Sequence, residues 1–76
     1  MSSPITDLLE RAHERLGLTP RQRQVLELVM TGATNRTVAE LLGICERTVE
    51  VHLTAIYERA GVENRTSLVW RVLGRA

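Results

Sequence analysis

The chain has 76 residues, enough for one domain, and a domain of this size buries only about 60% of the surface that its unfolded chain exposes. Hydrophobic residues make up 43% of the chain and charged residues 25%, as in globular proteins, and a net charge of +1 does not by itself indicate a nucleic-acid binder. A single cysteine excludes an internal disulfide and a thiolate metal cluster, and no apolar run approaches a membrane span or a signal peptide, so a cytoplasmic location is expected.

The first predicted helix spans about residues 4–16. Ser3 can cap it, Pro4 suits its first turn, and Gly17 ends it. Apolar residues recur at helical spacing along one side, which makes the helix amphipathic. They are Ile5, Leu8, Leu9, Ala12 and Leu16. His13 is expected to lie in solvent.

The second predicted helix opens at Thr19 and stops before Gly32. Thr19 and Gln22 stand three residues apart, as in a capping box in which each side chain binds the other residue's backbone N–H. The last predicted helix spans about residues 65–73, with Asn64 as its cap and Gly74 as its end. Its apolar arc leaves Trp70 outside.

The third and fourth predicted helices, about 35–42 and 46–60, are joined by a very short turn. The apolar residues of the first of them are Val38, Ala39, Leu41 and Leu42. Ala39 allows the two helices to approach closely, Gly43 supplies a left-handed backbone conformation, and Val49 fills the corner. Two helices joined in this way predict a helix-turn-helix, whose second helix enters the major groove of DNA.

A helical wheel of residues 46–60 separates an inward side from an outward side. The inward residues are Val49, Leu53, Ile56 and Ala60. The outward residues are Arg47, Val51, Thr54 and Glu58, with Thr48 and Glu50 on the flanks. An exposed Val51 suits a thymine methyl group, and Arg47 and Thr48 in the first turn suit phosphates or base edges.

These residues resemble a known family, because many spaced positions from Leu18 to about Val69 agree with it at once. The matching pieces are Leu18-Thr19-Pro20-Arg21, Val25-Leu26, Gly32-Ala33-Thr34-Asn35-Arg36, Val38-Ala39, Thr48-Val49, Val51-His52 and Gly61-Val62-Glu63-Asn64-Arg65-Thr66. The chain looks like the DNA-binding domain of the LuxR/GerE family of bacterial transcription regulators.

The resemblance implies an all-α fold: a bundle of four family-type helices containing a helix-turn-helix, here preceded by an extra N-terminal amphipathic helix. We expect that helix in residues 1–17, as a linker, a dimer contact or an extra packing helix, and the DNA-binding domain in residues 18–76. The resemblance assigns base reading to the positions of Glu50, Val51 and Thr54. It assigns contacts with the DNA backbone to the positions of Arg36, Thr48, Arg59 and Arg65, to which the wheel adds Arg47.

The resemblance also implies a homodimer on two-fold related half-sites, joined through the last helix. The residues expected at that interface are Val69, Trp70 and Leu73. An exposed Trp often marks an interface, although it could also lie flat over its own domain.

The chain departs from the family at the expected DNA surface. Glu50 replaces the usual Lys, Thr54 a frequent second cation, and Cys45 the usual capping Ser. Residues 46–60 therefore carry a net charge of −1, which should weaken sequence-independent binding to phosphates, while Glu50 can accept a hydrogen bond from cytosine N4. The alternative is a protein-interaction module of the same fold that modulates a related regulator.

No pattern in the sequence indicates an enzyme, a cofactor, a small-molecule ligand or a metal site. There is no nucleophile with a plausible base and no phosphate-binding Gly loop. His52 has no second ligand at helical spacing, so we expect it to pack or hydrogen-bond. Cys45 is interpreted as a substitute for Ser rather than as a redox sensor.

Overall fold

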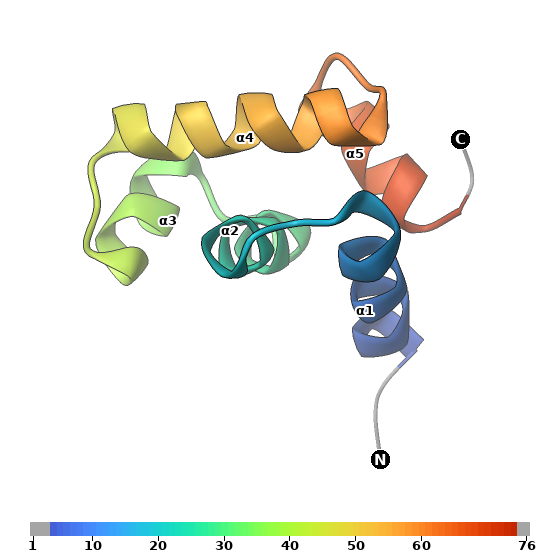
Figure 1. Ribbon diagram of the computed structural model, residues 1–76. Helices are drawn as coiled ribbons and strands as arrows, with labels where there is room; N and C mark the ends of the chain where they lie inside the picture. The colour runs from blue at the N-terminus through green and yellow to red at the C-terminus, as the bar shows by residue number, and fades with distance from the viewer. Residues whose placement is uncertain (1–3, 75–76) are drawn as a thin grey trace.

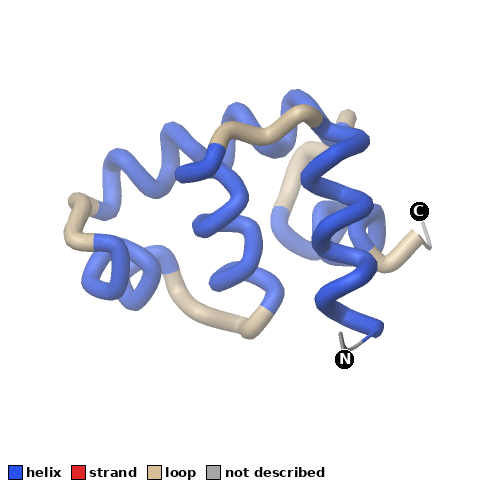
Figure 2. The backbone as a smooth tube through the Cα atoms, turned by 60° about the horizontal axis from the view of Figure 1, so that its bottom comes forward, coloured by secondary structure: helices blue, strands red, loops and turns tan. Residues whose placement is uncertain are grey.

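The structure is a computed structural model that describes residues 4–74, and within that range it consists of helices and short loops without strands (Figures 1 and 2). The helices are α1 (Pro4–Leu16), α2 (Pro20–Met30), α3 (Asn35–Leu42), α4 (Glu46–Ala60) and α5 (Arg65–Val72). The predicted all-helical fold is confirmed, and α5 ends one residue earlier than expected. Ser3 and the side chain of Ile5 lie outside the described part. No described helix is long and apolar enough to cross a membrane.

The starts of α2 and α5 follow from local capping chemistry. The Thr19 side chain accepts from the Gln22 N–H at 3.2 Å, and the Gln22 side chain accepts from the Thr19 N–H at 2.9 Å, which confirms the capping box. Asn64 accepts from the Ser67 N–H at 2.8 Å. Each of these bonds satisfies a backbone donor that the first turn of a helix leaves free.

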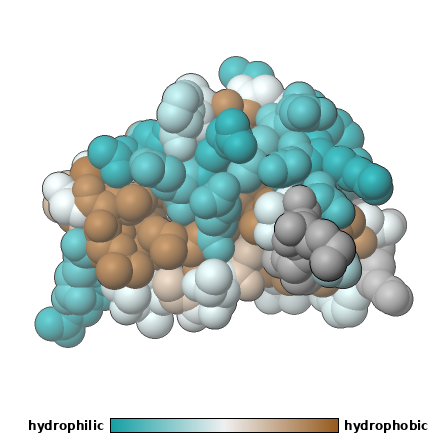
Figure 3. All heavy atoms as spheres, turned by 90° about the horizontal axis from the view of Figure 1, so that it is seen from below, coloured by the Kyte–Doolittle hydropathy of each residue, from teal (hydrophilic) through white to brown (hydrophobic). Residues whose placement is uncertain are grey.

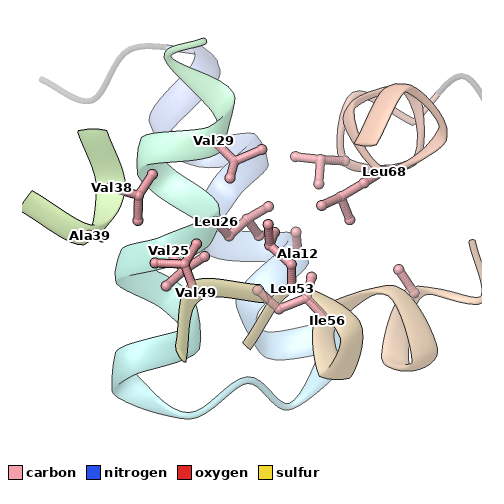
Figure 4. Close-up of a cluster of buried hydrophobic side chains, with 12 residues drawn as sticks. Ala12, Val25, Leu26, Val29, Val38, Ala39, Val49, Leu53, Ile56 and Leu68 are labelled. Atoms are coloured by element: carbon pink, nitrogen blue, oxygen red, sulfur yellow. The ribbon is translucent and has the colours of Figure 1, made fainter. Parts of the chain in front are cut away.

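The core gathers side chains from all five helices, which point toward one another in Figure 4. It consists of Ala12, Val25, Leu26, Val29, Val38, Ala39, Val49, Leu53, Ile56, Ala60, Leu68 and Val72. Because Ala12 is fully buried, α1 shares this core and packs on α4 and α5. The division of the chain at residue 17 stays a prediction.

Helix α4 runs across the top of the molecule in Figure 1 and contacts every other helix. The four residues expected on its inward side, Val49, Leu53, Ile56 and Ala60, are all buried. One side of α4 is therefore held by the whole core, and the opposite side faces away from the molecule.

The apolar residues of α3 have different environments. Val38 and Ala39 are buried, Leu42 packs partly on the core, and Leu41 is 64% exposed. Seen from the side away from α4, the surface shows an apolar area at the end of the molecule where α3 lies (Figure 3). This area is therefore separate from the outward side of α4.

Candidate nucleic-acid interface

The corner between α3 and α4 has the backbone geometry of a helix-turn-helix. Gly43 ends α3 with φ of 68° and ψ of 35°, in the left-handed region that favours glycine. The N–H groups of Gly43 and Ile44 both donate to the Ala39 carbonyl oxygen. Ala39 and Val49 are both buried, and α3 packs against α4, which fits the close approach and the filled corner that the sequence predicts.

The outward side of α4 brings together the residues that were expected to read bases. Glu50, Val51 and Thr54 are all exposed, and with Arg47, Ala55 and Glu58 they line a shallow hollow along the helix. Val51 is 57% exposed, so its methyl groups are open to a partner on this side of the helix. This surface has the shape and exposure that a groove-binding helix needs.

Two arginines near this surface form ion pairs with carboxylates one turn along their own helices. Arg36 Nε lies 3.2 Å from Glu40 Oε1 on α3, and Arg47 Nη1 lies 3.4 Å from Glu50 Oε2 on α4. All four side chains are well exposed, so solvent screens both pairs. Side chains four or three residues apart on a helix lie next to each other, so the sequence spacing contains the signal for both pairs.

The start of α4 carries a thiol where a hydroxyl would cap the helix. Cys45 is exposed and makes no side-chain hydrogen bond to the backbone of the first turn. Its Sγ atom lies 3.2 Å from Thr48 Oγ1, and the hydrogen bond with this side chain lowers the pKa of the thiol. Thr48 is half-buried, and its contact with the DNA backbone stays a prediction.

Arg65 is bound to another part of the chain rather than to solvent. Its Nη1 donates to the Ala33 carbonyl oxygen at 3.0 Å, and its Nη2 donates to Asn35 Oδ1. These bonds tie the first residue of α5 to the residues that flank the Thr34 cap of α3. A contact of Arg65 with DNA stays a prediction, and it would use the guanidinium donors that these two bonds leave free.

Arg59 lies far from Arg47 along α4, because twelve residues of helix rise about 18 Å. A Cβ atom added at Gly17 would be 3.5 Å from Arg59 Nη1, so the guanidinium reaches toward the end of α1. The contact predicted between Arg59 and the DNA backbone would therefore be made near the opposite end of the outward surface.

Trp70 stands out from α5 as predicted, with 48% of its surface exposed. It lines two shallow hollows: one with Val62, Asn64 and Ser67, and one with Val29, Val69 and Leu73 among others. Val69 and Leu73 are half-buried. The three residues predicted at a dimer interface are thus adjacent and accessible, and the interface itself stays a prediction.

The expectation that His13 lies in solvent is wrong, because the residue is only 5% exposed. Its Nδ1 accepts from Arg23 Nε at 3.0 Å, while its Nε2 is buried without a partner among the described residues. Burial, and secondarily the Arg23 charge, lower the pKa of His13, against the opposite effects of Glu27 and Glu10. The signal was present: His13 lies four residues after Leu9 and three before Leu16, on the apolar side of α1.

The part of the chain between residues 4 and 74 holds no cluster of three or more His, Cys, Asp or Glu side chains that could bind a metal ion.

The proteins that this chain resembles in sequence agree with the helix-turn-helix geometry. Residues 16–72 match the family described as bacterial regulatory proteins, luxR family. The chain is 37% identical over 71 residues to the transcriptional regulatory protein MctR of Rhizobium johnstonii and 37% identical over 70 residues to the probable transcriptional regulatory protein SgaR of Hyphomicrobium methylovorum. It is 42% identical over 52 residues to an HTH-type transcriptional regulator of Mycobacterium bovis.

These alignments cover 90%, 91% and 68% of the chain, respectively. The chain spans about a third of the length of MctR and SgaR, 33% in each case, and 6% of the mycobacterial protein. No solved structure matches the chain.

Proposed function

The chain belongs to the luxR family of bacterial regulatory proteins, and we propose that it regulates transcription by binding double-stranded DNA with α4 in the major groove. The observation that carries this proposal is the contrast between the two sides of α4. Its inward side is buried by the core, while Glu50, Val51 and Thr54 are exposed together on the outward side. A rigid helix with one free, mixed polar and apolar side fits a groove that presents both hydrogen-bonding edges and methyl groups.

The proposed base contacts follow from the chemistry of the three outward side chains. The Glu50 carboxylate only accepts hydrogen bonds, so it favours the amino group of cytosine. Val51 favours the methyl group of thymine, and Thr54 can donate or accept. The proposed partners of the DNA backbone are Arg36, Arg47, Thr48, Arg59 and Arg65. A protein with these contacts would act on the bacterial nucleoid, in the cytoplasm.

We further propose that two copies bind a two-fold symmetric site through α5. The support is the exposed Trp70 beside half-buried Val69 and Leu73, an aromatic and aliphatic surface of the kind that anchors protein interfaces. Sedimentation of Trp70→Ala should show a weaker dimer than the wild-type protein. An unchanged dimer would place the interface elsewhere on the chain.

Selection of bound duplexes from a randomised DNA pool tests the proposal, followed by titration of the selected duplex at several salt concentrations. We expect a two-fold symmetric sequence whose affinity falls steeply as salt rises, because phosphate contacts release counterions. Glu50→Gln should then relax the choice of base at one position of each half-site. No enrichment, with weak binding even at low salt, would favour the alternative module that acts through a protein partner.

A further inference from the structure

The ion pairs of the helix-turn-helix involve the arginines that are proposed to bind phosphate. Within residues 4–74 the side-chain ion pairs closer than 4 Å are Arg36–Glu40 and Arg47–Glu50. In each pair the carboxylate accepts from one guanidinium donor and offsets part of the positive charge that would attract a DNA phosphate. The two pairs lie on the two helices of the corner, and both are open to solvent.

Neither of the two helices carries a net positive charge that would attract phosphate. Helix α3 carries Arg36 and Glu40, for no net charge, and α4 carries three glutamates and two arginines, for a net charge of −1. Non-specific DNA binding depends on cations that neutralise phosphates, so such a surface should bind random duplex weakly.

Resting on the proposed function, we infer that Glu40 and Glu50 act as internal competitors of DNA phosphates, because each holds an arginine, Arg36 or Arg47, in an ion pair that phosphate must displace. Exposed ion pairs are weak, so a phosphate in the right place can replace the carboxylate. A released carboxylate must then find a new partner or lie beside a phosphate of like charge.

The two carboxylates differ in what a DNA site can offer them. Glu50 lies on the outward side of α4 with the proposed base-reading residues, so a cytosine amino group can satisfy it when Arg47 turns to phosphate. Glu40 lies on α3 and has no such role, so its effect should be the same for every sequence. Glu50 therefore penalises wrong sites more than right ones, and Glu40 lowers the affinity for all of them.

The test measures binding to random duplex and to the selected site for Glu40→Gln and Glu50→Gln across salt concentrations. Each change should tighten binding to random duplex about two- to fivefold, the range set by exposed ion pairs. The salt slope should steepen by close to one, because one more arginine becomes available to phosphate. Glu50→Gln should also narrow the ratio between selected and random DNA, whereas Glu40→Gln should leave that ratio unchanged.

Glu58→Gln is the matched control, because it removes the same charge from the outward side of α4 without breaking an ion pair. A cycle with Arg47→Gln tests whether Glu50 acts through that arginine. In the Arg47→Gln background, Glu50→Gln should no longer steepen the salt slope.

Two results would overturn the inference while leaving the proposed function intact. One is a wild-type protein that selects a site, with Glu40→Gln and Glu50→Gln binding random duplex no more tightly than it does. The other is that Glu40→Gln and Glu50→Gln tighten binding to random duplex no more than Glu58→Gln does, which would attribute the change to overall charge alone. Absence of binding by every variant at low salt would reject the proposed function and the inference together.

Discussion

The outward surface of α3 and α4 and the interfaces between the helices use similar residues in opposite ways. On the outward surface, Arg36 and Arg47 form ion pairs with carboxylates one turn along their own helices. Between helices, Arg23 binds the buried His13 of α1, and Arg65 binds Ala33 and Asn35. The arginines that face solvent have replaceable partners, whereas those between helices hold parts of the fold together. Of the two arginines between helices, Arg65 could bind DNA only through the guanidinium donors that its two bonds leave free.

The largest difference in stability that we expect between the two regions is between substitutions on the inward and outward sides of α4. Ile56 is fully buried, so Ile56→Ala removes packed side-chain volume and should lower the free energy of unfolding by about 2–5 kcal/mol. Val51→Ala on the outward side should change it by less than about 0.5 kcal/mol. Urea unfolding followed by circular dichroism measures both. Equal losses for the two variants would contradict the assignment of inward and outward sides.

A smaller loss of stability is expected when Arg65 is replaced. Arg65→Gln removes two charge-assisted hydrogen bonds and leaves the Ala33 carbonyl and Asn35 side chain without their donor, which should lower the free energy of unfolding by about 1–3 kcal/mol. Arg36→Gln breaks only an exposed ion pair, so its loss should stay below about 1 kcal/mol. The same urea titration compares them, and a greater loss for Arg36→Gln would reverse our distinction between the two arginines.

The cap of α4 should yield a gain of stability rather than a loss. In Cys45→Ser the hydroxyl can accept from the backbone N–H of the first turn, which the thiol leaves uncapped, so stability should rise by about 0.5–1 kcal/mol. Cys45→Ala, which supplies no acceptor, is the control and should give no gain. The midpoint of thermal unfolding reports both. A Ser variant no more stable than the Ala variant would show that the first turn is already satisfied by solvent.

Acidification should weaken the buried contact between α1 and α2. The pKa of His13 is lowered in the fold by burial and by Arg23, so the unfolded chain, with a pKa near 6.5, binds the proton more readily than the folded chain. The contribution of neutral His13 is therefore complete above about pH 6.5 and declines as pH falls toward the lower pKa of the folded state.

His13→Gln should remove this part of the pH dependence. Urea unfolding of the wild-type protein and the variant at several pH values between 7.5 and 5 measures it. His52→Gln, which leaves the His13–Arg23 contact in place, is the control and should keep the wild-type dependence. If the free energy of unfolding changes with pH in the same way for the wild-type protein and His13→Gln, His13 does not contribute to the pH dependence.

The features that could be predicted from the sequence depend on neighbours along the chain. Thr19, Gly43 and Asn64 define helix ends through bonds to residues three or four away, and the inward side of α4 follows from helical periodicity. The bonds of Arg65 could not be predicted, because they require residues about thirty positions apart to be placed in space. His13 is buried although it is polar, because its position on the apolar side of α1 decides its environment more than its residue type does.

The local character of the helix caps has a consequence for how fast the protein folds. Most of the described side-chain hydrogen bonds join residues three or four apart, so α2, α3 and α5 can form their first turns before the helices meet. Helical proteins with such local contacts fold within about microseconds to milliseconds. Among the described side-chain hydrogen bonds, those of Arg65 join the residues farthest apart in sequence, so they should form after the transition state. Arg65→Gln should therefore speed unfolding while leaving the folding rate nearly unchanged.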